Sequence, residues 1–211
     1  MADDNETIKK KSQMIEFMFG RCDKLLDEGK PDEAVACFRK ARGIAPEAGI
    51  TWYNEGKSLY LSSKFDEAIA CCDEAIKRSP EQWMPHALKA KCLFEFDRLD
   101  EATSEYEMAL KVNPKIVETL VSLAFCWLIQ KDLAKARDYA KTALEINSEK
   151  TLVLLREIDN VVAGMVFLEG EKVFMRLDDE FREEFEKIIR ELEAEKKTLD
   201  EKKSSEKGGK K

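Results

Sequence analysis

The sequence has little of what most enzyme and metal sites require. Among its 211 residues there is one histidine, His86, and no two cysteines are separated by only two residues. The nine glycines are scattered, and no phosphate-binding loop, nucleophile motif or HExxH zinc motif occurs. A structural zinc site needs three or four ligands at characteristic spacing. We therefore expect a protein that is not an enzyme and that holds no metal and no cofactor.

Two further absences concern the cellular setting. The net charge of −7 lacks the basic footprint of a nucleic-acid binder. The longest apolar stretch, TLVSLAFCWLI at 119–129, is shorter than the roughly 18–20 residues of a membrane span. The opening residues MADDNETIKKKSQM lack the basic start and apolar run of a secretory signal. We expect a cytoplasmic protein with no nucleic-acid or membrane partner.

The six cysteines allow two interpretations. Three disulfides would suit a small secreted domain, but no export signal is visible and the chain is long enough to hold a core without cross-links. Free thiols in a reducing cytosol are favoured, because unpaired cysteine is among the most buried residue types. The adjacent pair Cys71 and Cys72 raises the question of a thiol site, since two acidic residues follow it.

A fixed period runs through most of the chain. Two alanine series and one proline series step by the same interval of about 34 residues, without insertions. The first series is Ala34, Ala68, Ala102 and Ala136, the second is Ala41, Ala75, Ala109 and Ala143, and the third is Pro46, Pro80 and Pro114. A fixed period of this length indicates a repeat architecture in which neighbouring units stack.

The residues within one period predict a helix–turn–helix unit. Trp52, Gly56 and Leu59 fall on one face of a helix. Apolar residues at three- and four-residue steps over 65–76 then form a second amphipathic helix. Pro80 prevents this second helix from continuing. One such pair cannot bury its apolar face alone, so stacked neighbours must do so.

These features resemble the tetratricopeptide repeat family, whose units are about 34 residues long. The family's pattern is W-x2-x-G-x2-L in the first helix, followed by two spaced alanines in the second helix and a proline after it. The resemblance implies an all-α fold, a right-handed superhelical α-solenoid of helix–turn–helix repeats. Departures from the pattern include Cys22 in the glycine slot, His86 in the slot of Trp52 and Ser148 in the proline slot. The predicted repeats are residues 15–48, 49–82, 83–116 and 117–150.

The repeat frame changes the interpretation of the cysteines and of the histidine. Cys72 stands where Phe38 and Tyr106 stand in the neighbouring repeats, which predicts a packing role. His86 occupies a slot on the packing face of its helix. A recurring scaffold position is a simpler explanation for these residues than a thiol or general-base site.

The resemblance also implies where a partner would bind. In this family the first helix of each pair lines a concave face, and repeat positions 2, 5, 6, 9, 12 and 13 usually contact the ligand. About half of these positions here are aromatic or large aliphatic, which predicts an apolar groove, although some pack against the neighbouring helix instead. The candidate groove residues are Phe19, Asp23, Tyr53, Asn54, Lys57, Tyr60, Met84, Leu88, Lys91, Phe94, Val121, Phe125 and Leu128.

One ligand mode of the family is not supported by the residues. The carboxylate clamp for chaperone C-termini needs Lys, Asn and Arg at set positions, and here only Asn54 fits. Its flanking slots hold Phe19, Asp23, Met84 and Leu88. Lys57 and Lys91 share one position and suit an acidic partner residue, although exposed lysines are usually only solvated.

The C-terminal third departs from the period. Residues 151–168 are predicted to form a capping helix, and residues 171–197 a strongly amphipathic one. Three interpretations of the latter stay open: packing on the capping helix, which we favour, a coiled coil with a second copy, or helix-in-groove docking. The polar stretches 1–13 and 198–211 are predicted to be disordered.

The function predicted from the sequence is a non-catalytic scaffold or adaptor that binds a peptide or amphipathic helix of a protein partner. One alternative is a co-chaperone or complex-assembly factor without a standard carboxylate clamp. Another is a homo-oligomer assembled, or a groove self-occluded, through residues 171–197. Scaffolds of this fold host many different partners, so the fold does not name one.

Overall fold

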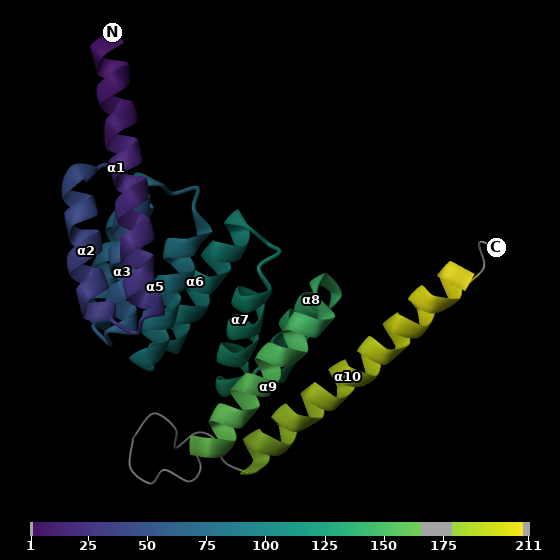
Figure 1. Cartoon of the computed structure of the whole chain (residues 1–211). Coiled ribbons are helices and arrows are strands. Elements are labelled where there is room, and N and C mark those ends of the chain that lie inside the picture. Colours follow the sequence, from purple (N-terminus) through teal and green to yellow (C-terminus); the bar gives the residue numbers. More distant parts are fainter. Residues whose placement is uncertain (1, 166–178, 209–211) are drawn as a thin grey trace. The chain divides into compact units, whose positions relative to one another are not determined.

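The computed structural model describes residues 2–165 and 179–208, and all regular structure within these ranges is helical, in ten helices (Figure 1). The chain divides into two compact units, Met1–Val112 and Asn113–Lys211. We call them the N-terminal unit and the C-terminal unit and describe each separately.

The N-terminal unit consists of three helix pairs. Each helix packs on the next one in sequence, and the first helices of the second and third pairs, α3 and α5, also contact each other. The helices are α1 (Ala2–Asp27), α2 (Pro31–Ile44), α3 (Gly49–Leu61), α4 (Phe65–Arg78), α5 (Trp83–Glu95) and α6 (Leu99–Val112). The period seen in the sequence therefore corresponds to one helix pair.

The turn inside each pair repeats as well. A residue with positive φ stands at Gly29, Ser63, Asp97 and Lys131, which follow one another at the interval of the repeat. The following amide donates to a carbonyl five residues earlier, as Lys64 does to Leu59 at 2.9 Å. This is the hydrogen bond of a helix C-cap with a left-handed residue. Only the first of the four turns has the glycine that this conformation favours.

The two alanine series lie where helices approach closely. All six of their members in the N-terminal unit are fully buried. Gly56 shows why the neighbouring slot is small, since a Cβ placed on it would stand 3.1 Å from Cβ of Cys71 and 3.4 Å from the carbonyl oxygen of Ala68. The small residues that define the period therefore set the distance between the two helices of a pair.

Charged residues join successive pairs of the N-terminal unit, and their signs are reversed between its two junctions. Glu55 on α3 is almost fully buried, and Arg39 Nε of α2 donates to its Oε1 at 2.9 Å. At the corresponding positions of the next repeat, Lys89 Nζ of α5 lies 2.7 Å from Oδ1 of Asp73 on α4. Between the first and second pairs, the acidic residue is therefore on the second pair. Between the second and third pairs, the acidic residue is again on the second pair and the basic residue is on the third. Arg42 forms a second ion pair with Glu55.

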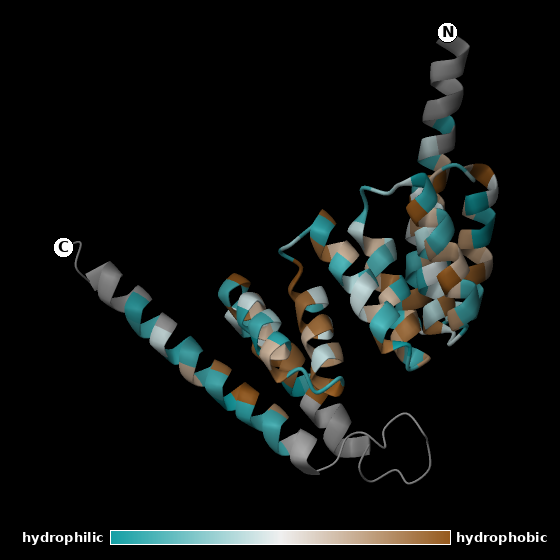
Figure 2. Cartoon of the chain, turned by 180° about the vertical axis from the view of Figure 1, so that it is seen from behind, coloured by the Kyte–Doolittle hydropathy of each residue, from teal (hydrophilic) through white to brown (hydrophobic). Residues whose placement is uncertain are grey.

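The C-terminal unit contains α7 (Val117–Ile129), α8 (Leu133–Ile146), α9 (Ser148–Met165) and α10 (Asp179–Gly208). Helix α10 packs on α9 and α8. Its apolar residues Phe185, Ile188, Ile189 and Leu192 are buried. Most of its other described residues are hydrophilic (Figure 2). Ion pairs line its edges, including Arg137–Glu191 at 3.0 Å, Lys141–Glu195 at 3.1 Å and Arg156–Glu193 at 2.6 Å.

The ends of the chain differ from the sequence prediction. Helix α1 begins at Ala2, so residues 2–13 are helical where disorder was predicted. Helix α10 continues to Gly208 and includes most of the predicted disordered tail. The predicted helices 151–168 and 171–197 correspond to α9 and α10 in part, and their residues 166–178 lie outside the described residues.

The prediction that all six cysteines are free thiols is wrong. Cys22 of α1 and Cys37 of α2 form a disulfide. The two residues occupy the repeat positions held by Gly56 and Cys71 in the second pair, where the two helices lie close together. Cysteine in the glycine slot of the first pair therefore faces a second cysteine directly. Four cysteines are free and buried, namely Cys71, Cys72, Cys92 and Cys126.

Candidate protein-binding face

Most of the candidate groove residues belong to the first helices of the pairs in the N-terminal unit. We call these residues the A-helix face. Because α3 and α5 lie side by side, equivalent positions on the two helices are neighbours. The A-helix face consists of Phe19 and Asp23 on α1, Tyr53, Asn54, Lys57 and Tyr60 on α3, and Met84, Leu88, Lys91 and Phe94 on α5.

The side chains of this face differ in exposure. Asp23, Lys57 and Lys91 are exposed. The aromatic and amide side chains of α3 are half-buried, and so are Met84 and Phe94. Leu88 is only 7% exposed. The two lysines are therefore accessible to a partner, and the apolar side chains beside them still present part of their surface.

Two contacts fix Tyr60 and Phe19, which are two of the aromatic side chains of the face. The phenol of Tyr60 on α3 donates to Oε1 of Glu95 on α5 at 3.3 Å. Burial, helped by the nearby Glu95 carboxylate, raises the pKa of Tyr60 to about 12, so the phenol remains protonated at neutral pH. The Phe19 ring of α1 meets Phe38 of α2 edge-on, with centroids 5.6 Å apart. Phe19 thus contributes to packing within its pair as well as to the face.

The candidates in the C-terminal unit are largely covered. Val121 and Leu128 of α7 are each 2% exposed. The Phe125 ring lies 6.2 Å from the ring of Phe185 on α10. These three residues are packing residues of the unit in this structure, so the accessible part of the predicted groove is the A-helix face.

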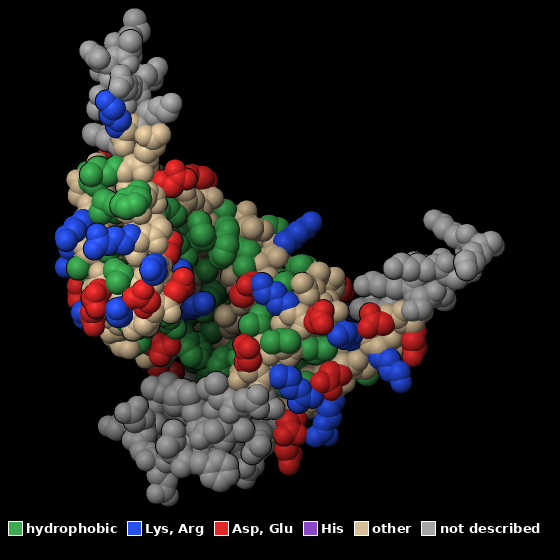
Figure 3. All heavy atoms as spheres, viewed as in Figure 1, with side chains coloured by type: hydrophobic (Ala, Val, Ile, Leu, Met, Phe, Trp, Pro, Cys, Tyr) green, Lys and Arg blue, Asp and Glu red, His purple; other side chains and the backbone are tan. Residues whose placement is uncertain are grey.

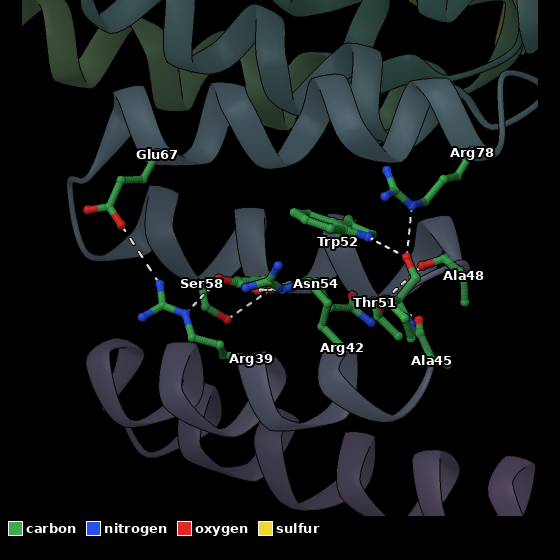
Figure 4. A network of polar contacts seen from close by, with 12 residues as sticks. Arg39, Arg42, Ala45, Ala48, Thr51, Trp52, Asn54, Ser58, Glu67 and Arg78 are labelled. Atoms are coloured by element: carbon green, nitrogen blue, oxygen red, sulfur yellow. Dashed lines mark hydrogen bonds and ion pairs between the residues drawn. The ribbon is translucent and has the colours of Figure 1, made fainter.

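A polar network that was not predicted from the sequence holds the start of α3 (Figure 4). Trp52 Nε1 and Arg78 Nε both donate to the carbonyl oxygen of Pro46 at 2.8 Å. The guanidinium carbons of Arg42 and Arg78 lie 4.2 and 4.6 Å from the centroid of the Trp52 ring. Each such cation–π contact contributes about 0.5–1 kcal/mol at a partly exposed site. The network fixes the helix that carries Tyr53 and Asn54.

His86 has a structural environment. It is 7% exposed, and its Nδ1 lies 2.7 Å from Oε2 of Glu105 on α6. Lys89 contacts the same carboxylate at 2.9 Å and also Asp73. Burial alone would lower the pKa of Lys89, but hydrogen bonds to both carboxylates outweigh it and raise the pKa. These contacts connect α4, α5 and α6.

The free cysteines lack the features of reactive thiols. Burial raises the pKa of Cys71, Cys92 and Cys126 to about 12, and it raises the pKa of Cys72 further. Reactive cysteines instead have a lowered pKa and partial exposure. Within residues 2–165 and 179–208, no group of three or more His, Cys, Asp or Glu residues is arranged to hold a metal ion. In the same ranges no helix combines the length and apolar character needed to cross a membrane.

Comparison with known families supports the repeat assignment. Profiles of the tetratricopeptide repeat family match residues 50–82 and residues 88–150. With helix pairs at the regular spacing of these repeats, the two matched segments are tetratricopeptide repeats. Members of this family are generally non-catalytic scaffolds for protein–protein interaction. No curated protein matches the sequence.

Solved structures share this fold at low sequence identity. The first repeat domain of Spaghetti (RPAP3), bound to the HSP90 peptide SRMEEVD, is 24% identical with a TM-score of 0.53, over 58% of this chain and 95% of that one. The second domain of human RPAP3, in complex with the HSP70 peptide SGPTIEEVD, is 18% identical with a TM-score of 0.52, over 55% and 97%. MamA from Desulfovibrio magneticus RS-1 is 15% identical with a TM-score of 0.61, over 86% and 96%. At these identities the likeness shows the fold alone.

Proposed function

We propose that this protein is a non-catalytic scaffold that binds a peptide or an amphipathic helix on its A-helix face. The observation that carries the proposal is the pairing of exposed Lys57 and Lys91 on adjacent helices with half-buried apolar side chains around them. An interaction site needs accessible apolar area for affinity and polar groups that fix orientation.

The face favours a segment that combines a large apolar side chain with an acidic one. Tyr53, Met84 and Phe94 offer apolar surface that is not fully covered. Lys57 and Lys91 attract carboxylates on the partner, which raises the association rate and selects against basic segments. The related repeat domains of RPAP3 were solved with the acidic peptides SRMEEVD and SGPTIEEVD, which supports an acidic ligand in general terms.

A chaperone-tail adaptor is less well supported. The clamp residues are missing, and Leu88, which stands in one of the clamp slots, is buried against the second helix pair near Gly56. A co-chaperone or assembly factor that binds its client by apolar contacts is therefore the second candidate. It uses the same face and differs in the identity of the partner.

Assembly through α10 is disfavoured by its packing. The apolar residues that would form a coiled coil, Phe185, Ile188 and Leu192, are almost fully buried within the chain's own C-terminal unit. A second copy would have to displace α9 and α8, and it would break the ion pair between Arg156 and Glu193.

The proposal is tested by selecting peptides from a displayed random library with the full-length protein. We expect enriched sequences with an aromatic or aliphatic residue next to acidic residues. The affinity of a selected peptide is then measured by fluorescence anisotropy. Lys57→Glu/Lys91→Glu should weaken binding by about tenfold or more, because two favourable charge contacts become repulsive.

A matched control comes from α2 and α4. Lys40→Glu/Lys77→Glu makes the same charge change at exposed lysines on second helices and should leave the affinity within about twofold. Equal weakening by the two double variants would show that only net charge matters. Unchanged binding by Lys57→Glu/Lys91→Glu would remove the A-helix face as the binding site.

A further inference from the structure

Helix α1 has a face that its counterparts α3 and α5 bury against a preceding helix. On α3 this face carries Thr51 and Glu55, which are 0% and 2% exposed under α2. The residues one repeat earlier on α1 are Phe17 and Arg21. Phe17 is 76% exposed and Arg21 is also exposed. Among the described residues of the N-terminal unit, no helix covers α1 as α2 covers α3.

The composition of this face on α1 is mixed. Met14, 58% exposed, lies next to Phe17 one turn away, and Arg21 and Lys24 continue the same row at helical spacing. Figure 3 shows hydrophobic side chains on α1 just below its grey end, with Lys and Arg side chains further along the helix. We call Met14, Phe17, Arg21 and Lys24 the α1 outer face.

The other helix pairs indicate what kind of residue fits Arg21. At this repeat position α3 has Glu55, which binds Arg39 of the preceding helix, and α5 has Lys89, which binds Asp73 of the preceding helix. In both cases the preceding helix supplies the opposite charge. Since Arg21 is basic like Lys89, its counterpart is an acidic residue.

We propose that the α1 outer face binds an amphipathic helix of a partner protein, in the place that α4 occupies on α5. The partner helix carries acidic residues at positions i and i+4, opposite Lys24 and Arg21. It carries large apolar residues at i+7 and i+11, opposite Phe17 and Met14. This order follows from the antiparallel packing of consecutive helices. Arg39 of α2 contacts Glu55 of α3. Arg42 comes three residues later on α2 and lies against the ring of Trp52, three residues earlier on α3.

The face is carried by a helix whose position is fixed. The Cys22–Cys37 disulfide and the edge-on contact of Phe19 with Phe38 fasten α1 to α2 on its opposite side. A docked helix therefore does not have to order α1 first, which lowers the entropic cost of binding.

Charge disfavours a second copy of α1 as the occupant. An antiparallel pair of α1 helices centred between Met14 and Phe17 would place Arg21 of one copy opposite Lys10 of the other. Like charges that face each other across a helix interface are destabilising. A partner helix with the acidic pattern instead places its carboxylates opposite Arg21 and Lys24.

The probe for this proposal is a helical peptide made from residues 64–80 of the chain, hydrocarbon-stapled on its outer side. Its substitutions are Ile69→Glu, Cys71→Ala, Cys72→Ala and Pro80→Leu. Ile69→Glu and the retained Asp73 supply the acidic positions i and i+4. The retained Ile76 and Pro80→Leu supply the apolar positions i+7 and i+11. A matched basic peptide has Ile69→Lys and Asp73→Lys instead. Fluorescence anisotropy with the full-length, oxidised protein should give at least about tenfold tighter binding for the acidic peptide.

Variants of the protein complete the test. Arg21→Glu/Lys24→Glu should reverse the preference between the two peptides, and Phe17→Asp should remove binding of both, with circular dichroism and an intact disulfide confirming the fold. Equal affinity for the two peptides overturns the proposal. So does loss of acidic-peptide binding in Lys57→Glu/Lys91→Glu, which would assign the peptide to the A-helix face. A dimer of the free protein that Phe17→Asp dissociates in sedimentation would make a second copy the occupant and also overturn it.

Discussion

Reduction of the Cys22–Cys37 disulfide should destabilise the N-terminal unit selectively. The disulfide joins α1 to α2, and α1 packs mainly on α2. Within the described residues, the first pair therefore lacks the preceding helix on which the second and third pairs pack. We expect the cross-link to replace part of the stability that stacking gives to the other pairs.

The size of the effect follows from the loop that the disulfide closes. A sequence separation of 15 residues corresponds to about 3 kcal/mol of lost unfolded-chain entropy. The unit spans Met1–Val112, and an unfolding entropy of about 2.1 cal/mol/K per residue converts this to a fall in Tm of about 13 °C if the unit melts cooperatively. If α1 detaches separately, the fall is smaller and α1 alone loses protection.

The assay is a thermal melt of the full chain with and without a phosphine reductant, together with hydrogen exchange of α1. Mass spectrometry verifies that the disulfide is reduced. Cys22→Ala/Cys37→Ala should melt like the reduced protein and should no longer respond to the reductant. The reasoning fails if the fully reduced wild-type protein keeps both its Tm and the amide protection of α1.

Three further effects are expected. Lys131→Gly should stabilise the C-terminal unit by about 0.5–1 kcal/mol in guanidinium titrations, because φ is +63° at this position and a side chain is disfavoured there. Phe185→Ala should cost about 3–4 kcal/mol because the ring is buried, whereas Phe17→Ala at an exposed site should change stability by less than about 0.5 kcal/mol. The four free thiols, Cys71, Cys72, Cys92 and Cys126, should resist alkylation at pH 8 until the protein unfolds. The free energy of unfolding should fall as the pH rises above about 9, because the unfolded chain then ionises these thiols whereas the folded chain keeps them protonated.

Each of these effects has a contrary result. A loss of stability in Lys131→Gly would mean that glycine's entropy in the unfolded chain outweighs the strain at this turn. Equal stability losses in Phe185→Ala and Phe17→Ala would contradict the packing of α10. Rapid alkylation of native protein would contradict the raised pKa of the thiols.

The repeat pattern was a sufficient basis for predicting the helix pairs. Alanine at positions such as Ala68 and Ala75 is required by close helix approach, so the period carries direct information on packing. The helical structure of residues 2–13 at the start of α1 and of residues 198–208 at the end of α10 was not predictable in the same way. Polar, charged residues fill these segments, and their composition resembles that of disordered chains.

The disulfide was not predicted, because the expectation of free thiols rested on the missing export signal and on a chain long enough to hold a core without cross-links. Cys22 stands in the slot of Gly56, and Cys37 stands in the slot of Cys71. A Cβ on Gly56 would lie 3.1 Å from Cβ of Cys71 in the second pair, and Cys22 is bonded to Cys37 in the first, so the two slots face each other in both pairs. The pairing of Cys22 with Cys37 follows from the packing of the two helices in three dimensions, and the spacing of the cysteines along the sequence does not indicate it.

The exposure of the groove candidates also required the structure. Repeat position predicts the direction of a side chain, but the residues packed over it decide how much remains accessible. Leu88 and Val121 hold positions that contact ligands in the family, yet both are buried. Phe125 lies against Phe185, a residue outside the repeats that no repeat pattern could place.

The reversed charges at the two junctions of the N-terminal unit have a genetic consequence. Deletion of residues 49–82, which is one unit of the repeat, would keep the repeat frame. It would join α2 directly to α5 and bring Arg39 against Lys89, so two cations would replace the ion pairs with Glu55 and Asp73. Units with the same backbone are therefore not interchangeable, and a shortened gene would encode a chain whose new junction repels itself.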